Sequence, residues 1–276
     1  MRRLAAAGGL GLAATAALLF GIACSGTDEL ILATTTSTQD SGLLDVLIPE
    51  FEKVSGYRVK TIAVGSGQAL RLGEEGEADV LLVHSPEAEA AFMDAGHGVE
   101  RSSVMHNDFV IVGPPDDPAG IAGISSAADA LSLIAQSGSP FLSRGDMSGT
   151  HAREFNLWLE AGIAPAGSWY QETGQGMGQT LLIANEKRGY TLTDRGTYLA
   201  QIDNLSLEIL TEGDANLFNP YHVIIVDPGK SSRINEAGAR AFAAFITSAP
   251  VQETIRTFGI EEYGQSLFVP DAEQQP

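Results

Sequence analysis

The sequence predicts an α/β protein of two domains that close on each other like a clamshell. Short apolar strands alternate with amphipathic helices along most of the chain, a pattern typical of sheets covered by helices. Three connections from a strand to a helix are rich in hydroxyl groups and glycine, and ligands bind such sheets at the carboxyl ends of their strands. A length of 276 residues suits two domains with a large core.

The first strand, loop and helix follow the amino-terminal segment. Residues 30–33 are a short apolar strand, and residues 43–51 have the apolar spacing of a helix. Between them lies the threonine-rich loop, residues 34–42, with the sequence TTTSTQDSG. Backbone N–H groups converge where a strand passes into a helix, so this loop offers hydrogen-bond donors to an anion.

Two further units of the same kind come next. Residues 57–64 alternate like a strand and lead into the glycine–serine loop, residues 65–68, and a helix that begins near Ala69. Residues 78–83 form a third apolar strand, and a helix is expected over residues 86–95. Strands that alternate with helices in this way predict a mostly parallel sheet.

The division into domains is expected at two crossovers. An apolar strand over residues 105–113 ends at the sequence PPDDP, residues 114–118, which we expect to mark the first crossover. The return is expected at residues 216–220, before a strand over residues 221–226, and helices near 234–246 and 251–258 then pack on the first domain. The predicted domains are residues 29–112 with 220–269, and residues 113–219, followed by a polar tail over 270–276.

The arginine loop, residues 143–151, is the most informative segment for function. Its sequence SRGDMSGTH supplies the guanidinium of Arg144, several hydroxyl groups, and glycines that let backbone N–H groups approach a ligand closely. An amphipathic helix follows, so unpaired N–H groups and the positive end of the helix dipole point at one spot. This arrangement suits an oxyanion; the alternative is an ordinary helix start capped by Ser148 or Thr150.

Three segments carry a resemblance to a known family: residues 34–43 (TTTSTQDSGL), residues 143–151, and residues 190–196 (YTLTDRG). They resemble the substrate-binding proteins of tungstate ABC importers, within the wider group of periplasmic oxyanion-binding proteins. The resemblance covers the chain from about Glu29 to Val269. It implies a type II periplasmic-binding-protein clamshell, with mixed, mostly parallel sheets flanked by helices and the ligand in the interdomain cleft.

The resemblance also implies the contacts of the oxyanion. In the family, the threonine-rich loop and the arginine loop hold the anion from opposite domains. Ser66 and Gly67 are added by their position in the glycine–serine loop. The implied ligand-binding residues are Thr35, Thr36, Ser37, Ser66, Gly67, Arg144, Ser148, Gly149 and Thr150.

The implied ligand is tungstate, delivered to the permease of an ABC importer. The pattern from Arg144 to Thr150, R-x-D-x-S-G-T, also resembles the anion loop of phosphate-binding proteins. Phosphate and molybdate therefore remain alternative ligands, and molybdate is an alternative also because its charge, shape and radius nearly equal those of tungstate.

The amino-terminal segment has the features of an export signal. Residues 1–23 begin with two arginines and continue as an apolar stretch, and Cys24, the single cysteine, precedes polar residues. We expect cleavage before Cys24, a lipid on Cys24 and a tether over residues 24–28. Gly21 departs from the Leu that lipoprotein signals usually carry there. Export without a lipid and an uncleaved membrane helix are the alternatives. We expect a periplasmic protein or a lipoprotein held at the cell surface through Cys24.

The formal net charge of −19 argues against binding to nucleic acid, which needs basic patches. Exposed charges are screened over about 8 Å in physiological salt, so the affinity for an anion must come from local donors and Arg144. We expect a monomer without a cofactor.

A secreted serine hydrolase or phosphatase using Ser148, His151 and Asp146 is the alternative from another class of function. The nucleophile elbow G-x-S-x-G is absent, because Asp146 stands where the first glycine would be. The five histidines show no metal-binding spacing, and a single cysteine excludes a thiolate cluster. We therefore expect a binding protein without a metal cation, not an enzyme.

The remaining residues of interest are given structural or secondary roles. Asp146 is expected to orient Arg144, because a carboxylate that faces a dianion is repelled; the alternative is that Asp146 accepts a proton from a protonated oxyanion. Thr191 and Thr193 are candidate secondary contacts of the ligand. Trp158 and Trp169 are expected to fill the core of the second domain.

Overall fold

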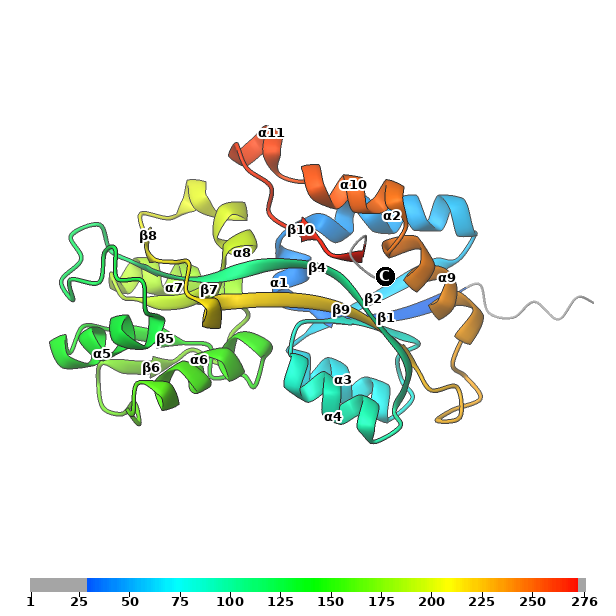
Figure 1. Ribbon diagram of the computed structural model, residues 1–276, viewed down its shortest axis with the longest axis horizontal. Coiled ribbons are helices and arrows are strands. Elements are labelled where there is room, and N and C mark those ends of the chain that lie inside the picture. Colours follow the sequence, from blue (N-terminus) through cyan, green and yellow to red (C-terminus); the bar gives the residue numbers. More distant parts are fainter. Residues whose placement is uncertain (1–28, 273–276) are drawn as a thin grey trace, which may run out of the picture.

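The computed structural model describes residues 29–272, which form two lobes joined by two long strands (Figure 1). The predicted signal peptide, Cys24 and the tether lie outside these residues. No helix within residues 29–272 has both the length and the apolar character needed to cross a bilayer.

The first lobe begins with strand–helix units, as predicted. Its elements are β1 (Glu29–Thr35), α1 (Thr36–Asp40), α2 (Leu43–Ser55), β2 (Arg58–Val64), α3 (Ser66–Glu74), β3 (Val80–Val83) and α4 (Pro86–Asp94). β1 pairs in parallel with both β2 and β3. All three strands therefore end at the same edge of the sheet, where the threonine-rich loop and the glycine–serine loop follow β1 and β2.

Apolar side chains alternate between the two faces of this sheet. Leu32 and Leu82 pack with α2 and the C-terminal helices, whereas Ala33 and Leu81 pack with α3 and α4. Strand residues alternate in direction, so a strand with apolar residues at successive positions has both faces covered. This alternation explains why the first lobe is a sheet between two layers of helices.

Two long strands connect the lobes. β4 (Gly98–Gly113) pairs with β9 (Phe218–Val226) in antiparallel fashion over its first part, up to the pair Asp108–Phe218. From Phe109 onward, β4 pairs instead with strands of the second lobe. Figure 1 shows β4 and β9 running side by side from one lobe to the other.

The second lobe is built around the end of β4, with β7 on one side and β8 on the other. Its elements are α5 (Ala127–Ser137), β5 (Phe141–Ser143), α6 (Gly149–Glu160), β6 (Tyr170–Glu172), α7 (Met177–Lys187), β7 (Thr191–Asp194), α8 (Arg195–Ala200) and β8 (Glu208–Thr211), with 3₁₀ turns at Ile202–Asn204 and Ala215–Leu217. Trp158 is buried in the core of this lobe, and Trp169 packs against the same core.

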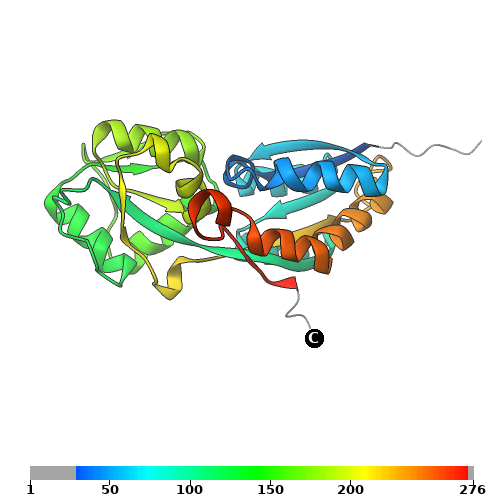
Figure 2. The same cartoon turned by 90° about the horizontal axis from the view of Figure 1, so that it is seen from above.

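The C-terminal segment returns to the first lobe, as predicted. It consists of α9 (Glu236–Ile246), α10 (Ala249–Thr257), α11 (Ile260–Tyr263) and β10 (Val269–Pro270), which pairs with β4. Seen from above, α11 lies over the region where the two lobes meet (Figure 2).

The strand pairing differs from the sequence prediction in three respects. The pairing partners change inside β4, at residues 108–109, and not at the PPDDP segment, because one continuous strand serves both lobes. The sheet is mixed, as predicted, but antiparallel pairings outnumber parallel ones, because β9 runs antiparallel to both β3 and β4. Pro270 belongs to β10, and the Asp271 N–H donates to Val104, so the C-terminal segment stays packed on the sheet beyond residue 269.

Candidate functional site

The threonine-rich loop contains a short helix, α1, that the sequence analysis treated as loop. Thr35 caps it: its Oγ1 accepts the N–H of Thr38 at 3.3 Å. Thr35 Oγ1 also lies 3.1 Å from Ser37 Oγ and 2.7 Å from Thr38 Oγ1. All three side chains are buried, so this run of hydroxyl groups forms the floor of the loop.

The glycine–serine loop supplies a buried hydroxyl group that lacks a partner. Gly65 caps α3 in an extended conformation, and Ser66 is the first residue of that helix. Ser66 is 1% exposed, and within the described part of the chain its Oγ has no hydrogen-bond partner. A buried unpaired hydroxyl costs roughly 1–3 kcal/mol, so the position favours a partner that a ligand would supply.

The arginine loop combines a helix start with a buried guanidinium. Ser148 caps α6, because its Oγ accepts the N–H of His151 at 3.2 Å. Arg144 is only 2% exposed and donates to Asp146 Oδ2 through Nε at 3.1 Å and Nη2 at 2.5 Å. Its Nη1 also reaches Thr150 Oγ1 at 3.4 Å. Asp146 thus orients the guanidinium, as the sequence analysis predicted.

The three loops meet at the interface between the lobes. Arg144 Nη2 donates to Thr36 Oγ1 at 3.1 Å across this interface, and Gly67 packs beside the carbonyl of Met147. A Cβ on Gly149 would lie 3.0 Å from Ser66 Oγ and 2.7 Å from Ser85 Oγ. The nine residues implied by the family resemblance are therefore brought to one place, with the two lobes in contact around them.

The electrostatic setting of this interface is mixed. Arg144 is the one permanently charged member of the nine residues, and Asp146 balances it at the edge of the interface. Asp194 is fully buried nearby, and this burial raises its pKa, while hydrogen bonds from Thr197 and the charge of Arg144 act in the opposite direction. Burial also lowers the pKa of His84 to about 4, so its ring is neutral near pH 7.

The sequence analysis missed several polar residues behind the threonine-rich loop. They are His84, Asn107, Asn219 and Thr197, all buried. A single histidine or asparagine after a strand has no local pattern that marks it, so only the fold brings these residues together. Their hydrogen bonds are considered below.

Other residues singled out in the sequence have structural roles in this structure. The hydroxyls of Thr191 and Thr193 donate to the backbone carbonyls of Leu142 and Asp194. His151 Nδ1 accepts the N–H of Met147, and nothing in this contact resembles a serine–histidine pair. The structure therefore gives no support to the hydrolase alternative.

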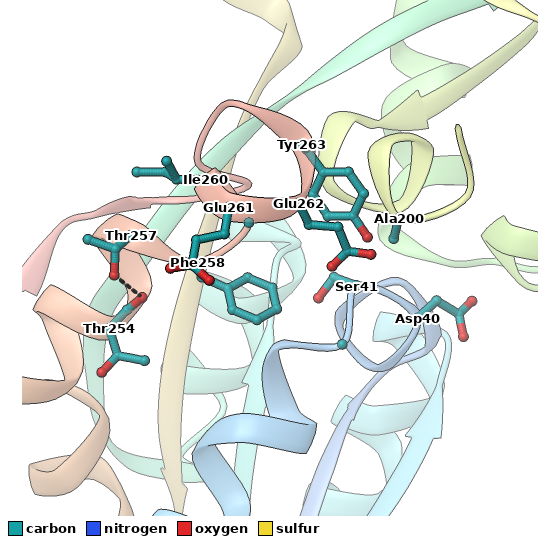
Figure 3. Close-up of a pocket in the computed structure, with 12 residues that line it drawn as sticks. Asp40, Ser41, Ala200, Thr254, Thr257, Phe258, Ile260, Glu261, Glu262 and Tyr263 are labelled. Atoms are coloured by element: carbon teal, nitrogen blue, oxygen red, sulfur yellow. Dashed lines mark hydrogen bonds between the residues drawn. The ribbon is translucent and has the colours of Figure 1, made fainter. Parts of the chain in front are cut away.

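A cavity of about 910 Å³ lies near this interface but is a different feature (Figure 3). It is lined by the ends of α1 and α8 and by the segment from α10 to α11, including Asp40, Glu261 and Glu262. Three carboxyl groups around an open cavity disfavour an anion. Within residues 29–272, no group of three or more His, Cys, Asp or Glu side chains is arranged to hold a metal cation.

A family model and several known proteins match most of this chain. The model of the PBP superfamily domain matches residues 23–250. The chain is 51% identical over 246 residues to the tungstate-binding protein of Peptoclostridium acidaminophilum, covering 88% of this chain and 86% of the relative. It is 43% identical over 241 residues to the tungstate-binding protein of Campylobacter jejuni, covering 86% of this chain and 88% of the relative.

Two solved structures are similar over most of their length. The crystal structure of the tungstate ABC transporter from Geobacter sulfurreducens is 50% identical, with a TM-score of 0.76, over 83% of this chain and 98% of that one. The tungstate-binding protein from Desulfovibrio alaskensis G20 is 47% identical, with a TM-score of 0.72, over 88% of this chain and 98% of that one.

Proposed function

The chain belongs to the family of tungstate-binding proteins within the PBP superfamily, and we propose that it captures tungstate between its two lobes and delivers it to an ABC importer. The relatives are named for binding a solute, and the proposed role is likewise binding without catalysis. The anion would be held by the nine residues of the three loops, with Arg144 supplying the positive charge.

One observation carries the proposed site. Among residues 29–272, Ser66 Oγ has no hydrogen-bond partner, and it is buried at the point where the three loops meet, beside the N-terminus of α6 and within the same interface as Arg144. Buried polar groups are nearly always hydrogen-bonded, so an unpaired hydroxyl here is best explained by a ligand. Charge-assisted hydrogen bonds from a buried arginine are about twice as strong as neutral ones, which favours an anion.

The donors at the interface favour a fully deprotonated anion. The nine residues offer N–H groups, hydroxyl groups and a guanidinium, while the Asp146 carboxylate is already occupied by Arg144 and by the N–H of Ser148. Tungstate carries no proton near neutral pH and presents only acceptors. Phosphate carries a proton that needs an acceptor, and leaving a buried donor unpaired costs roughly 1–3 kcal/mol.

Competition calorimetry tests this proposal. The protein without residues 1–23 is titrated with tungstate alone, and then with tungstate in the presence of molybdate, sulfate or phosphate. We expect tight tungstate binding that phosphate and sulfate do not displace at equal concentration. Displacement by phosphate would refute the choice of ligand, while equal binding of molybdate would widen it to both metal oxyanions.

We also propose that the protein is exported and attached to the membrane through a lipid on Cys24. The basic start, the apolar stretch and the single cysteine before polar residues support this attachment. A lipid would raise the local concentration of loaded protein beside the permease without any new contact. Mass spectrometry of Cys24 in protein from the native host tests this proposal, and an unmodified cysteine on a freely released protein would exclude the anchor but not the binding function.

A further inference from the structure

Six buried polar side chains form a closed ring of hydrogen bonds beside the proposed anion site. Ser37 Oγ lies 3.2 Å from His84 Nε2, and His84 Nδ1 lies 2.8 Å from Asn219 Oδ1. Asn219 Nδ2 donates to Asn107 Oδ1 at 2.7 Å, and Asn107 Nδ2 to Asp194 Oδ1 at 3.5 Å. Thr197 closes the ring through its single hydroxyl proton, which is shared between Asp194 Oδ2 at 2.8 Å and the backbone carbonyl of Ser37 at 3.4 Å. We call this set the hinge ring.

The direction of these hydrogen bonds is set at Asp194. Its carboxylate accepts from Asn107 and from both the N–H and the hydroxyl of Thr197. The amide nitrogen of Asn107 therefore faces Asp194, and its oxygen faces the nitrogen of Asn219. The remaining oxygen of Asn219 requires a proton on Nδ1 of His84, which leaves a lone pair on Nε2.

The hydroxyl of Ser37 consequently donates to His84. The histidine is 3% exposed and stacks on Tyr221 at a centroid distance of 4.6 Å, so its ring has little freedom to turn away. Burial lowers the pKa of His84 to about 4, and the neutral ring required by this hydrogen-bond direction is thus the prevailing form near pH 7. Ser37, in the threonine-rich loop, is held in place from behind.

The hinge ring spans the connection between the lobes. Asn107 and Asn219 are paired opposite each other on β4 and β9, one pair before β4 changes its strand partners. Ser37 and His84 belong to the first lobe, whereas Asp194 and Thr197 belong to the second. Two links of the ring therefore hold the second lobe in place. Asn107 to Asp194 connects it to the hinge strands, and Thr197 to Ser37 connects it to the threonine-rich loop.

We propose that His84 is a positioning residue for anion binding, which couples the placement of Ser37 to closure of the lobes through the hinge ring. This inference rests on the proposed function. When the lobes separate, the contact of Thr197 with the carbonyl of Ser37, which joins the two lobes directly, is lost, and the ring no longer orders Ser37 from both sides. Closure would thus order the threonine-rich loop at the moment at which the anion is enclosed.

A double-mutant cycle in tungstate binding tests the coupling. The variants are His84→Phe, which keeps a ring on Tyr221 but removes both nitrogens, Ser37→Ala, and the two combined. His106→Phe is the matched control: His106 packs against Phe218 with its ring tilted and forms a hydrogen bond with Asp271, but it lies outside the hinge ring. Affinity is measured by calorimetry, and folding is checked by thermal unfolding.

We expect His84→Phe to weaken tungstate binding roughly tenfold, the cost of about one buried hydrogen bond. In the Ser37→Ala background, the same change should cost less than about threefold, because the residue on which His84 acts is already altered. His106→Phe should bind as the parent does. Unchanged affinity in His84→Phe, or losses that multiply in the double variant, would overturn the proposal.

A second variant covers the case in which His84→Phe does not fold. In His84→Gln, the side-chain amide can form a hydrogen bond with only one of the two partners of His84, Ser37 or Asn219. We expect its tungstate affinity to lie between those of the parent and His84→Phe. A His84→Gln protein with the parent affinity would equally overturn the coupling. If the parent itself fails to bind tungstate, the proposed function fails and this inference with it; if the parent binds and the His84 variants match it, only the inference fails.

Discussion

At the scale of single residues, Arg144 is the group on which the proposed site depends most. It is almost fully buried, and its guanidinium contacts Asp146, Thr36 and Thr150 from both lobes. The contacts with Asp146 and Thr150 lie within the second lobe, so they hold the planar group in one orientation whether or not the lobes are closed. An anion at this point would gain a fixed charge-assisted donor without paying to order a long side chain.

Replacement of Arg144 by alanine is expected to weaken tungstate binding by about 2 kcal/mol or more, roughly thirtyfold, because the buried dianion loses its charged donor. Arg144→Lys should recover only part of this loss, since an ammonium lacks the planar fork that reaches Thr36 and Asp146 together. Arg188→Ala, which removes an exposed arginine of the second lobe, is the control. Calorimetric titration gives the result, and parent-like binding by Arg144→Ala would place Arg144 outside the site.

Sequence motifs predict the residue types of the site better than its hydrogen bonds. Hydroxyl and glycine residues after strands, and one arginine before a helix, form local patterns that can be recognised in a single sequence. The unpaired Ser66 and the contacts of Gly149 across the interface arise only when the two lobes meet. His84 and Asn219 are 135 residues apart, so no local spacing connects them.

At the scale of elements, α6 joins the arginine loop to a buried acid. Glu154 is 2% exposed and accepts from Trp158 Nε1 at 3.1 Å and the Tyr170 hydroxyl at 2.9 Å, and burial raises its pKa to about 7. Ser143, at the start of the arginine loop, also bonds this carboxyl group. The core of the second lobe therefore contains a group that titrates in the neutral range.

Glu154→Gln is expected to change how stability depends on pH. Between about pH 4.5 and 7, the unfolded chain ionises Glu154 while the folded protein keeps it protonated, so the parent loses about 3 kcal/mol of stability as pH rises through this range. Glutamine is neutral throughout and keeps an acceptor for Trp158 and Tyr170. Urea unfolding at pH 4.5 and 7.5 gives the difference between the two proteins, and a constant difference would show that Glu154 ionises normally in the folded state.

Element types were predicted well where a strong apolar period exists and less well where strands serve two lobes. The strands and helices of the first lobe follow from runs such as residues 30–33 and 43–51, which pack on one sheet. The first half of β4, residues 98–104, was missed because its side chains before Val104 are exposed or half-buried without an alternating pattern, and because it carries Glu100 and Arg101. Its conformation is decided by pairing with β9, which is more than 100 residues away in sequence.

At the scale of the whole molecule, the two lobes are in close contact, and glycine is required at that contact. Gly149 has an ordinary backbone conformation, but an added Cβ would lie 2.7 Å from Ser85 Oγ and 3.0 Å from the carbonyl of His84 in the first lobe. The backbone carbonyl cannot move away without displacing the strand end from which it comes. A larger side chain at position 149 would therefore prevent the two lobes from closing fully.

Gly149→Ala is expected to hold the lobes apart, weaken tungstate binding more than about tenfold and leave the protein folded. Small-angle scattering in the presence of tungstate should show an expanded molecule where the parent is compact. Gly65→Ala is the matched control, because its Cβ would meet Ser148 at an ordinary contact distance of 3.4 Å across the same interface. A compact Gly149→Ala protein with parent affinity would contradict this role.

The passage of β4 and β9 through both lobes gives the connection a particular mechanical character. Most two-part proteins that open and close are joined by loops, which bend at individual bonds and lose their order as they do so. A joint of paired strands instead stores the motion as a small change of twist shared among several residues, and its ladder hydrogen bonds persist. The paired strands therefore resist twisting and favour one relative orientation of the lobes. Backbone amides of β4 from Met105 to Asp108 should exchange with solvent equally slowly with and without tungstate.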